Sequence, residues 1–194
     1  TQELARSMDV NLKKLFLLER KNDFGYGRSS TDGFKWVLEK SYDNVITMDA
    51  DFSHDFNAVP DLLEKLKNFD VAVGSRYVKS GGIKNWNFFR MVLSRFANFY
   101  VKIILDLPIV DATTGFNAYR VNSLRKINLD EIKSDGYAFL VELKYRLLKV
   151  GCRFVEHPIL FSERREGQSK MSSKGIWESV KLPWRLKLKT NLFS

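Results

Sequence analysis

The fold of this chain is decided at residues 44–55, which read NVITMDADFSHD. Residues 44–48 form a mainly apolar run of strand length, and two aspartates, Asp49 and Asp51, follow closely. Short apolar runs bounded by polar residues indicate buried strands, and side chains two residues apart in an extended chain point to the same side. The stretch therefore predicts a buried strand that presents two carboxylates together at its carboxyl end.

The elements around this strand alternate between strands and helices. Further strands are expected at residues 14–18 and 71–73, and helices at residues 34–38 and 57–66. Such alternation is typical of βαβ units and of a parallel sheet, in which ligands bind at the carboxyl ends of the strands. The pattern predicts an α/β fold with a mostly parallel central sheet flanked by helices, and it places Arg76 at the same edge as the aspartates.

The second half of the chain predicts longer elements and no separate domain. Helices are expected at residues 86–105 and 138–149, and a strand is expected at residues 153–161. Residues 173–194 form a basic amphipathic segment with interleaved tryptophan and leucine. Because 194 residues without repeats, low-complexity tracts or linkers have room for one core, we expect a single domain over residues 1–194.

The charge of the chain indicates an anionic partner. The formal net charge is +9, and residues 164–194 hold eight basic and two acidic residues, which is six of these nine charges. Nucleic acid, a phosphorylated substrate and a lipid surface are the candidate partners. We expect no nucleic-acid partner, because zinc-finger and RNA-recognition signatures are absent and the acidic residues at 49–55 would repel nucleic acid.

Other features exclude further classes of protein. A hydrophobic content of 44% and a charged content of 28% are ordinary for a globular protein. The single cysteine, Cys152, excludes an internal disulfide framework and fits a reducing compartment. No run approaches the roughly 18 consecutive apolar residues that a membrane-spanning helix needs.

The aspartate pair has the chemistry of a divalent-cation site. Mg²⁺ and Mn²⁺ are commonly held by one or two carboxylates, while water and substrate phosphate oxygens complete their coordination. Asp49 and Asp51 therefore suit a nucleotide diphosphate that is bound through a metal ion. By itself, however, an Asp-x-Asp sequence more often marks a turn rich in helix-capping acids, and His54 is more often a loop or core histidine than a ligand.

Four blocks of sequence supply the wider context, namely VITMDADFSHD, GSRYVKSGG, NWNFFRMVLSRFANFYVKIILDLPIVDATTGFNAYR and SDGYAFLVELKYRLLKVGCRFVEHPILFSERREGQSKM. In this order and spacing, they closely resemble the dolichol-phosphate mannosyltransferases, which are inverting enzymes of glycosyltransferase family 2 with the GT-A fold. The resemblance implies transfer of mannose from GDP-mannose to dolichyl or polyprenyl phosphate, with Mg²⁺ or Mn²⁺ as the cofactor. The alternatives are transfer of glucose or an aminosugar from a UDP-sugar to polyprenyl phosphate, or an inactive nucleotide-sugar or nucleic-acid binding module.

The resemblance also implies roles for individual residues. The metal ligands that it implies are Asp49, Asp51 and Ser53. The residues implied for the nucleotide sugar and its phosphates are Asp49, Ala50, Arg76, Arg164 and Lys170. The residues implied for the sugar and acceptor side are Arg90, Thr113, Thr114, Gly115, Tyr137 and Glu142. Of all these, Asp51, Arg76 and Arg164 are expected to take part directly in catalysis. An acceptor phosphate monoester has a second pKa of about 6, so it is already a nucleophilic dianion and no strong general base is expected.

Aromatic and basic residues in the second half predict a membrane partner. Basic amphipathic segments with Trp and Phe lie in the membrane interface. The residues expected there are Trp86, Phe88, Phe89, Trp177, Lys181, Trp184 and Arg185. They predict a peripheral protein on the cytoplasmic face of a membrane. For the helix at residues 86–105, the alternative is that its apolar face packs into the core of the domain, and the sequence leaves this choice open.

The first residues predict that part of the natural protein is missing from this sequence. Residues 1–8 read as the later part of a helix, and relatives have a strand, a helix and a second strand before it. The resemblance therefore implies that roughly 40 to 50 preceding residues are absent, about one βαβ unit with its loops. Without them, we expect an open sheet edge and an incomplete nucleotide pocket.

Overall fold

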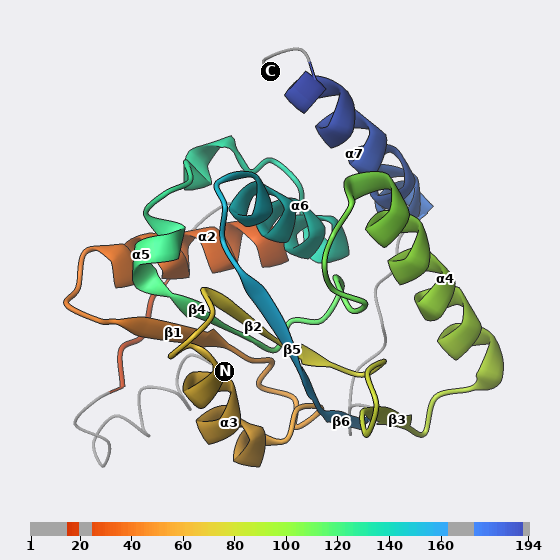
Figure 1. Cartoon of the computed structure of the whole chain (residues 1–194), viewed down its shortest axis with the longest axis horizontal. Coiled ribbons are helices and arrows are strands. Elements are labelled where there is room, and N and C mark those ends of the chain that lie inside the picture. Colours follow the sequence, from red (N-terminus) through yellow and green to blue (C-terminus); the bar gives the residue numbers. More distant parts are fainter. Residues whose placement is uncertain (1–14, 20–24, 163–172, 192–194) are drawn as a thin grey trace.

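The computed structural model describes residues 15–19, 25–162 and 173–191, and in the last helix it describes the side chains of residues 179–188. A four-stranded sheet lies at its centre, with the strand order β1-β4-β2-β5 (Figure 1). The strands of this sheet are β1 (Asn44–Thr47), β2 (Val71–Ser75), β4 (Asn117–Arg120) and β5 (Phe154–Pro158). A second sheet pairs β3 (Gly82–Lys84) with β6 (Leu160–Ser162).

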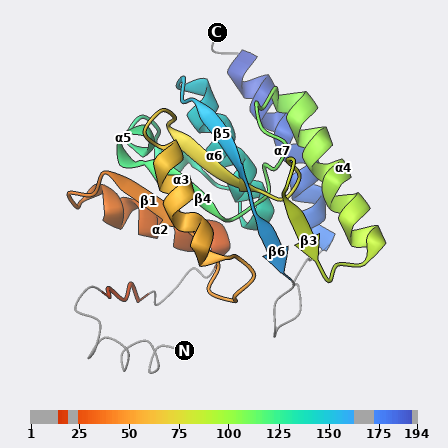
Figure 2. The same ribbon diagram turned by 60° about the horizontal axis from the view of Figure 1, so that its bottom comes forward.

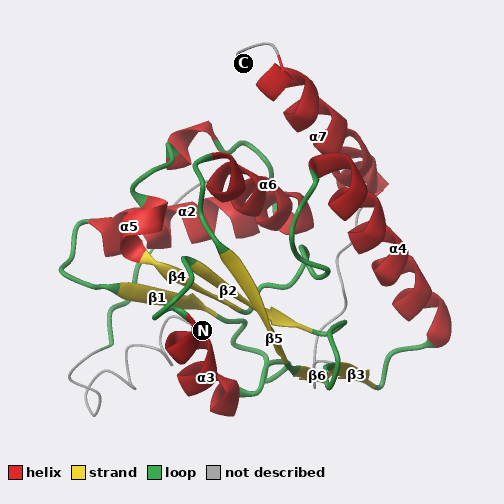
Figure 3. Cartoon of the chain, viewed as in Figure 1, coloured by secondary structure: helices red, strands yellow, loops and turns green. Residues whose placement is uncertain are grey.

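Helices cover both faces of the central sheet (Figure 3). They are α2 (Tyr26–Leu38), α3 (Val59–Lys65), α4 (Phe88–Leu105), α5 (Val121–Leu124), α6 (Gly136–Lys149) and α7 (Ser173–Asn191), with short 3-10 turns at Phe56–Ala58 and Leu129–Glu131. The helices α2, α5 and α6 lie on one face and α3 lies on the other. Beyond the edge formed by β5, α4 and α7 pack side by side (Figure 2).

Strand direction brings one more loop to the predicted ligand edge. The strand β4 runs antiparallel to both β1 and β2, whereas β2 and β5 are parallel. In the register, Asn117 at the start of β4 lies opposite Thr47 at the end of β1 and opposite Val73 of β2. The expected α/β fold is confirmed, and the sheet is mixed because β4 is inserted antiparallel. As a result, the chain that leads into β4 reaches the edge at which β1 and β2 end.

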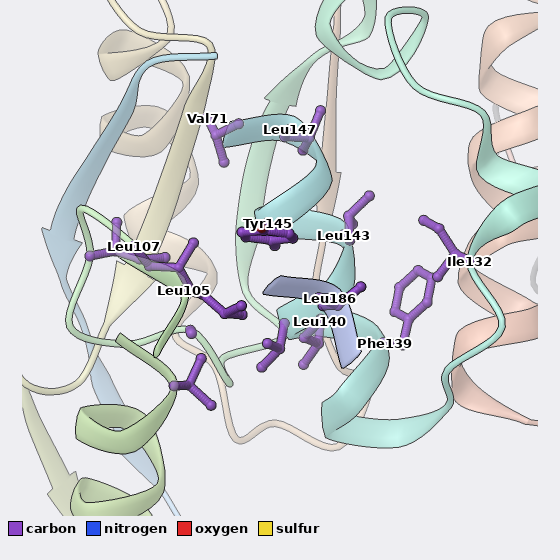
Figure 4. Packing of buried hydrophobic residues seen from close by; sticks show 14 of the residues in the cluster. Val71, Leu105, Leu107, Ile132, Phe139, Leu140, Leu143, Tyr145, Leu147 and Leu186 are labelled. Carbon is purple, nitrogen blue, oxygen red and sulfur yellow. The ribbon is translucent and has the colours of Figure 1, made fainter. Parts of the chain in front are cut away.

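The core forms where the alternating side chains of the sheet meet the helices. Val71 and Val73 of β2 join the larger apolar cluster under α6, while Ala72 between them joins a smaller cluster under α3. Figure 4 shows the larger cluster, in which Leu143 and Leu147 of α6 lie near the other labelled apolar side chains. Such alternation along a strand that is covered on both faces explains why β2 is buried throughout.

Two sequence predictions about strands need correction. Residues 15–18 do not form a buried strand, since they pair with no strand in the described part of the chain and Phe16 is 65% exposed. Phe16 instead packs on Trp36 of α2, with ring centroids 5.0 Å apart, because a short apolar run can equally serve as a loop that covers a helix. The predicted strand at 153–161 is divided between two sheets, and the division falls at Ile159, after Pro158, whose nitrogen cannot donate to a ladder.

The structure settles which face α4 presents to the core. Val101, Ile104 and Leu105 are buried, whereas Phe96 and Phe99 are 63% and 61% exposed. The apolar face of this helix is therefore wider than the surface that the domain covers. Across the described residues, no helix has both the length and the apolarity that crossing a membrane would require.

Candidate active site

The predicted aspartates lie just beyond β1, at the edge of the sheet where the chain enters β4. The hydroxyl of Thr47, the last residue of β1, donates to the backbone oxygen of Gly115 at 2.7 Å. This hydrogen bond ties the end of one strand to the loop before the other. Asp49 is half-buried beside the loop, whereas the neighbouring Ala50 is exposed. The structure therefore brings the acidic pair and the segment 111–116 together.

Buried polar side chains hold the turn that carries the aspartates. The Oδ1 of Asp51 accepts hydrogen bonds from the backbone nitrogen and the hydroxyl of Ser53, at 3.0 and 2.5 Å. The Nδ1 of His54 accepts from the backbone nitrogen of Asp49 at 3.2 Å, and the imidazole stacks on Phe116. Burial lowers the pKa of His54, while the charges of Asp49 and Asp51 oppose that shift. His54 is thus a core histidine, and Ser53 orients Asp51 from a buried position.

The donor set fits a hard divalent cation with an open coordination shell. The described residues contain no group of three or more His, Cys, Asp or Glu side chains that could enclose a metal ion. Two carboxylates at the mouth of a site are what Mg²⁺ or Mn²⁺ needs when water and phosphate oxygens supply its other ligands. Asp49 and Asp51 are residues that would hold such an ion, and direct coordination by Ser53 stays a prediction.

A buried ion pair joins the end of β2 to the loop before β4. The guanidinium of Arg76 binds the carboxylate of Asp111 through Nε and Nη2, each at 2.7 Å, and Arg76 also donates its backbone nitrogen to Oδ2 at 3.0 Å. Its Nη2 reaches the hydroxyl of Thr113 at 2.9 Å. Burial lowers the pKa of Arg76, but its pairing with Asp111 more than offsets this, so the net direction is upward. Arg76 was predicted to face phosphate. In the structure, its two guanidinium donors bind a protein carboxylate in a bidentate pair.

Three side chains that the sequence analysis did not identify hold the same loop. Glu156 of β5 accepts from the backbone nitrogens of residues 110 and 111, and Asn98 of α4 accepts from those of residues 112 and 113. Lys144 of α6 is fully buried, and its Nζ donates to the backbone oxygens of residues 112 and 114, both at 3.1 Å. For Asn98 and Lys144, the signal in the sequence was a polar residue at an inward position of an otherwise apolar helix face.

The environment of Lys144 changes its protonation. Burial lowers the pKa of this lysine to about 7, while Asp111 and Glu156 act in the opposite direction and Arg76 adds to the decrease. An amine donates to two carbonyls in either protonation state. Lys144 can therefore keep both hydrogen bonds to the loop while its charge responds to pH or to nearby anions.

Two residues predicted for the acceptor side and for the membrane, Glu142 and Trp86, have partners within the protein. Glu142 is only 3% exposed, and its carboxylate binds the Ser134 hydroxyl and the guanidinium of Arg146 one turn later on α6. Its role on the sugar or acceptor side stays a prediction. Trp86, predicted to reach a membrane, is half-buried and lies within 4.0 Å of the guanidinium carbon of Arg90 and 5.7 Å of that of Arg76. Its ring therefore packs against Arg76 and Arg90 rather than on the outer surface. We call these three residues the arginine cluster.

The remaining predicted residues divide into those that the structure gathers and those that it does not describe. Thr113 and Gly115 lie at the site edge, and Thr114 is buried, where its hydroxyl accepts from the Phe116 nitrogen at 3.3 Å. Tyr137 is partly exposed at the start of α6. The predicted phosphate ligands Arg164 and Lys170 lie outside the described residues, as does the side chain of Trp177.

Comparison with known proteins identifies the family to which this site belongs. Residues 1–128 match the glycosyl transferase family 2. The chain belongs to this family. It is 42% identical over 164 residues to the undecaprenyl-phosphate mannosyltransferase of Micrococcus luteus, covering 84% of this chain and 68% of that protein. It is 39% identical to the polyprenol monophosphomannose synthase of Mycolicibacterium smegmatis, covering 86% and 63% of the two chains.

Three further comparisons define how far the likeness extends. The dolichol-phosphate mannosyltransferase of Pyrococcus furiosus is 35% identical over 95% of this chain, which spans 50% of that protein. Among solved structures, a mycobacterial protein gives a TM-score of 0.55 at 14% identity over 88% of this chain and 54% of its own. Glucosyl-3-phosphoglycerate synthase from Mycobacterium tuberculosis, solved with Mn²⁺, UDP-glucose and glycerol 3-phosphate, gives 0.51 at 12% identity over 92% and 58%. The structural likeness supports the GT-A fold.

Breaking the Arg76–Asp111 pair should destabilise the whole domain. Asp111→Ala leaves a buried guanidinium without its counter-charge, and such losses typically cost about 3–5 kcal/mol. Urea unfolding of wild type and variant measures the change. As a matched control, Asp130→Ala removes the exposed carboxylate that pairs with Lys35, and it should leave the midpoint almost unchanged. If both substitutions lowered the urea midpoint equally, the buried Arg76–Asp111 pair would not stabilise the domain more than an exposed ion pair does.

The low pKa of Lys144 predicts a specific pH dependence of stability. Between about 7 and its ordinary value of 10.5, the folded protein binds fewer protons than the unfolded chain. The free energy of unfolding of wild type, measured relative to Lys144→Met, should therefore rise with pH across this window. The slope is at most about 1.4 kcal/mol per pH unit. Denaturant titrations of both proteins from pH 6 to 10 test this, and a flat difference would show that Lys144 keeps its ordinary pKa.

Proposed function

We propose that this chain is the catalytic domain of an inverting polyprenyl-phosphate mannosyltransferase, which moves mannose from GDP-mannose to dolichyl or polyprenyl phosphate. The observation that carries the proposal is the acidic pair Asp49 and Asp51, held by Ser53 and His54 against the loop before β4. Three relatives named for transfer to such lipids, at 35–42% identity, support the acceptor class. The chain spans between half and about two thirds of their length, so the complete activity is part of the proposal.

The proposed cofactor is Mg²⁺ or Mn²⁺. When bound, such an ion neutralises the charge that develops on the departing diphosphate. Within the chain, Asp49 and Asp51 would hold the ion, and the hydrogen bonds from Ser53 keep the Asp51 carboxylate turned to one orientation. The glucosyl-3-phosphoglycerate synthase structure contains Mn²⁺ together with a nucleotide sugar, which supports this class of ion.

The proposed acceptor needs no strong general base, and both histidines and Glu142 already have partners within the protein. The chain has two histidines. His54 is buried and binds the Asp49 nitrogen, while His157 of β5 faces Asp61 at 3.5 Å. Glu142 is occupied by Ser134 and Arg146. An acceptor whose phosphate is already a dianion near neutral pH needs no proton removed.

We assign the acceptor phosphate to the arginine cluster at the start of α4. The guanidinium of Arg90 stacks on Trp86, whose buried Nε1 has no hydrogen-bond partner among the described residues. An indole N–H and a guanidinium are both suitable donors to phosphate oxygens. The first residues of α4 beside this cluster, Phe88 and Phe89, are 76% and 77% exposed, and a lipid chain would extend along them.

We further propose that α4 and α7 rest on the cytoplasmic face of a membrane. The two helices contact each other, and the Tyr100 hydroxyl of α4 donates to the backbone oxygen of residue 180 at 2.8 Å. Their exposed apolar side chains include Phe88, Phe89, Phe96, Phe99, Ile103, Trp184 and Leu188. Exposed basic residues, among them Lys181 and Arg185, flank this surface. The combination is typical of interfacial helices that bind anionic lipid.

The decisive experiment on the activity is Asp51→Asn in the full-length protein. The exchange keeps the volume of the side chain but removes metal-binding charge, and losses of this kind lower kcat by about 10²–10³-fold. Transfer of labelled mannose from GDP-mannose to a short polyprenyl phosphate with Mn²⁺ provides the readout. Asp55→Asn is the matched control, because Asp55 is exposed and caps a short turn, a role that asparagine retains.

Parallel reactions with UDP-glucose and UDP-N-acetylglucosamine separate the proposal from its closest alternative. Preference for a UDP-sugar would replace mannose transfer with glucose or aminosugar transfer. Full activity of Asp51→Asn at saturating Mn²⁺ would reject a metal-dependent site at this position.

Membrane docking is tested by co-sedimentation with vesicles that contain anionic phospholipid. Phe96→Ser combined with Phe99→Ser removes two exposed apolar side chains from α4, and Lys181→Glu combined with Arg185→Glu reverses two charges on α7. Each double variant should bind less than wild type, and added salt should weaken wild-type binding. Lys65→Glu with Lys126→Glu is the control of equal charge at two exposed positions elsewhere. Binding that none of these changes affects would contradict the proposed surface.

A further inference from the structure

The side chain of Tyr26 has a fixed direction at the start of α2. Tyr26 is the first residue of this helix and lies between Gly25 and Gly27. A Cβ on Gly27 would lie 2.5 Å from the backbone oxygen of Ser134, and the Gly27 nitrogen donates to Asp135 Oδ1 at 2.5 Å. The start of the helix is therefore pressed against the chain before α6. The phenol ring packs edge-on against Phe139, with centroids 6.1 Å apart, which fixes the ring itself.

The hydroxyl of Tyr26 and the carboxylate of Asp49 meet over Gly115. A Cβ added to Gly115 would lie 2.9 Å from the Tyr26 hydroxyl and 3.4 Å from Asp49 Oδ1. Both oxygens thus face the same small space above the backbone of the loop, which a side chain at position 115 would enter. Tyr26 is 37% exposed, so the residue is not enclosed in the core.

The phenol of Tyr26 and the carboxylate of Asp49 have complementary hydrogen-bonding groups. A neutral phenol can donate one hydrogen bond and accept others, whereas a carboxylate can only accept. Side by side, the two groups offer both halves of the hydrogen bonding that a hydroxyl, or two adjacent hydroxyls, can make.

We propose that Tyr26 is a donor-binding residue, whose hydroxyl, together with Asp49, recognises a hydroxyl group of the ribose or of the hexose in the nucleotide sugar. This inference rests on the proposed function and deepens it. Tyr26 lies in none of the blocks 45–55, 74–82, 85–120 and 134–171 that carry the resemblance. Its role follows from the convergence of three chain segments, at α2, after β1 and before β4.

The first test is Tyr26→Phe, measured as steady-state kinetics and as calorimetric binding of the donor to the full-length protein. Removal of one neutral hydrogen bond corresponds to about 2- to 10-fold weaker binding. We expect the KM for GDP-mannose and its Kd to rise by this factor, with kcat changed less than twofold and the thermal midpoint unchanged. Tyr42→Phe is the control, because Tyr42 is an exposed tyrosine that packs on Trp36 away from Gly115.

The ligands GDP and GDP-mannose distinguish the two sources of the hydroxyl. If Tyr26→Phe binds both ligands more weakly than wild type, the Tyr26 hydroxyl contacts the ribose. If it binds only GDP-mannose more weakly, the hydroxyl contacts the hexose. An unchanged Kd for both ligands would overturn the inference. A wild-type protein that binds no GDP-mannose and transfers no sugar would instead reject the proposed function, so the two failures are distinct.

A second variant pair checks the geometry. Gly115→Ala places a methyl group where the Tyr26 hydroxyl and Asp49 converge, so it should weaken donor binding more than Tyr26→Phe does. When Tyr26→Phe is combined with Gly115→Ala, the Tyr26 hydroxyl no longer clashes with the added methyl group. The fold-loss of donor affinity in this double variant should therefore be smaller than the product of the fold-losses in the two single variants. Independent, multiplying losses would show that the hydroxyl does not lie over Gly115 and would overturn the inference.

Discussion

The site depends on one buried ion pair, between Arg76 at the end of β2 and Asp111 in the loop before β4. Both side chains are at most 5% exposed, and three hydrogen bonds join them. Charges taken out of water require close pairing, so this geometry allows little movement of either chain segment. The pair thereby sets the position of Thr113 and of the backbone near Gly115, which is the surface that the acidic turn after β1 faces.

A small network of charged side chains surrounds this pair, and its positive and negative charges are nearly balanced. Arg76 and Lys144 supply positive groups, and Asp111 and Glu156 supply negative ones. Burial lowers the pKa of the lysine, whose two hydrogen bonds hold the loop. A rigid loop suits a proposed reaction in which phosphate groups enter and leave, because preorganised groups need not rearrange as charge develops.

The exposed apolar surface of α4 has a different origin, namely that the domain covers only part of this helix. The domain buries only Val101, Ile104 and Leu105 of the apolar face of α4, and α7 covers another part of it. The phenylalanines that remain exposed, such as Phe96, extend from the end of α4 at which Arg90 stacks on Trp86. One helix therefore connects the proposed phosphate site with the proposed membrane surface. A substrate with a charged head and an apolar tail fits that arrangement.

The sequence by itself determined the strand before Asp49, the α/β class and the acidic pair, because these follow from local periodicity, and four motifs in a fixed order indicated the family. The tertiary structure alone decided which partners the charged side chains take. Glu142, predicted for the sugar side, is held by Arg146 of its own helix and by Ser134, and Tyr26 lay in no motif, yet its hydroxyl and Asp49 both face Gly115. Asp111 binds a residue 35 positions away, a separation at which no local pattern indicates contact. Such pairings depend on how strands are ordered and which way they run, and that is settled only when the whole core packs.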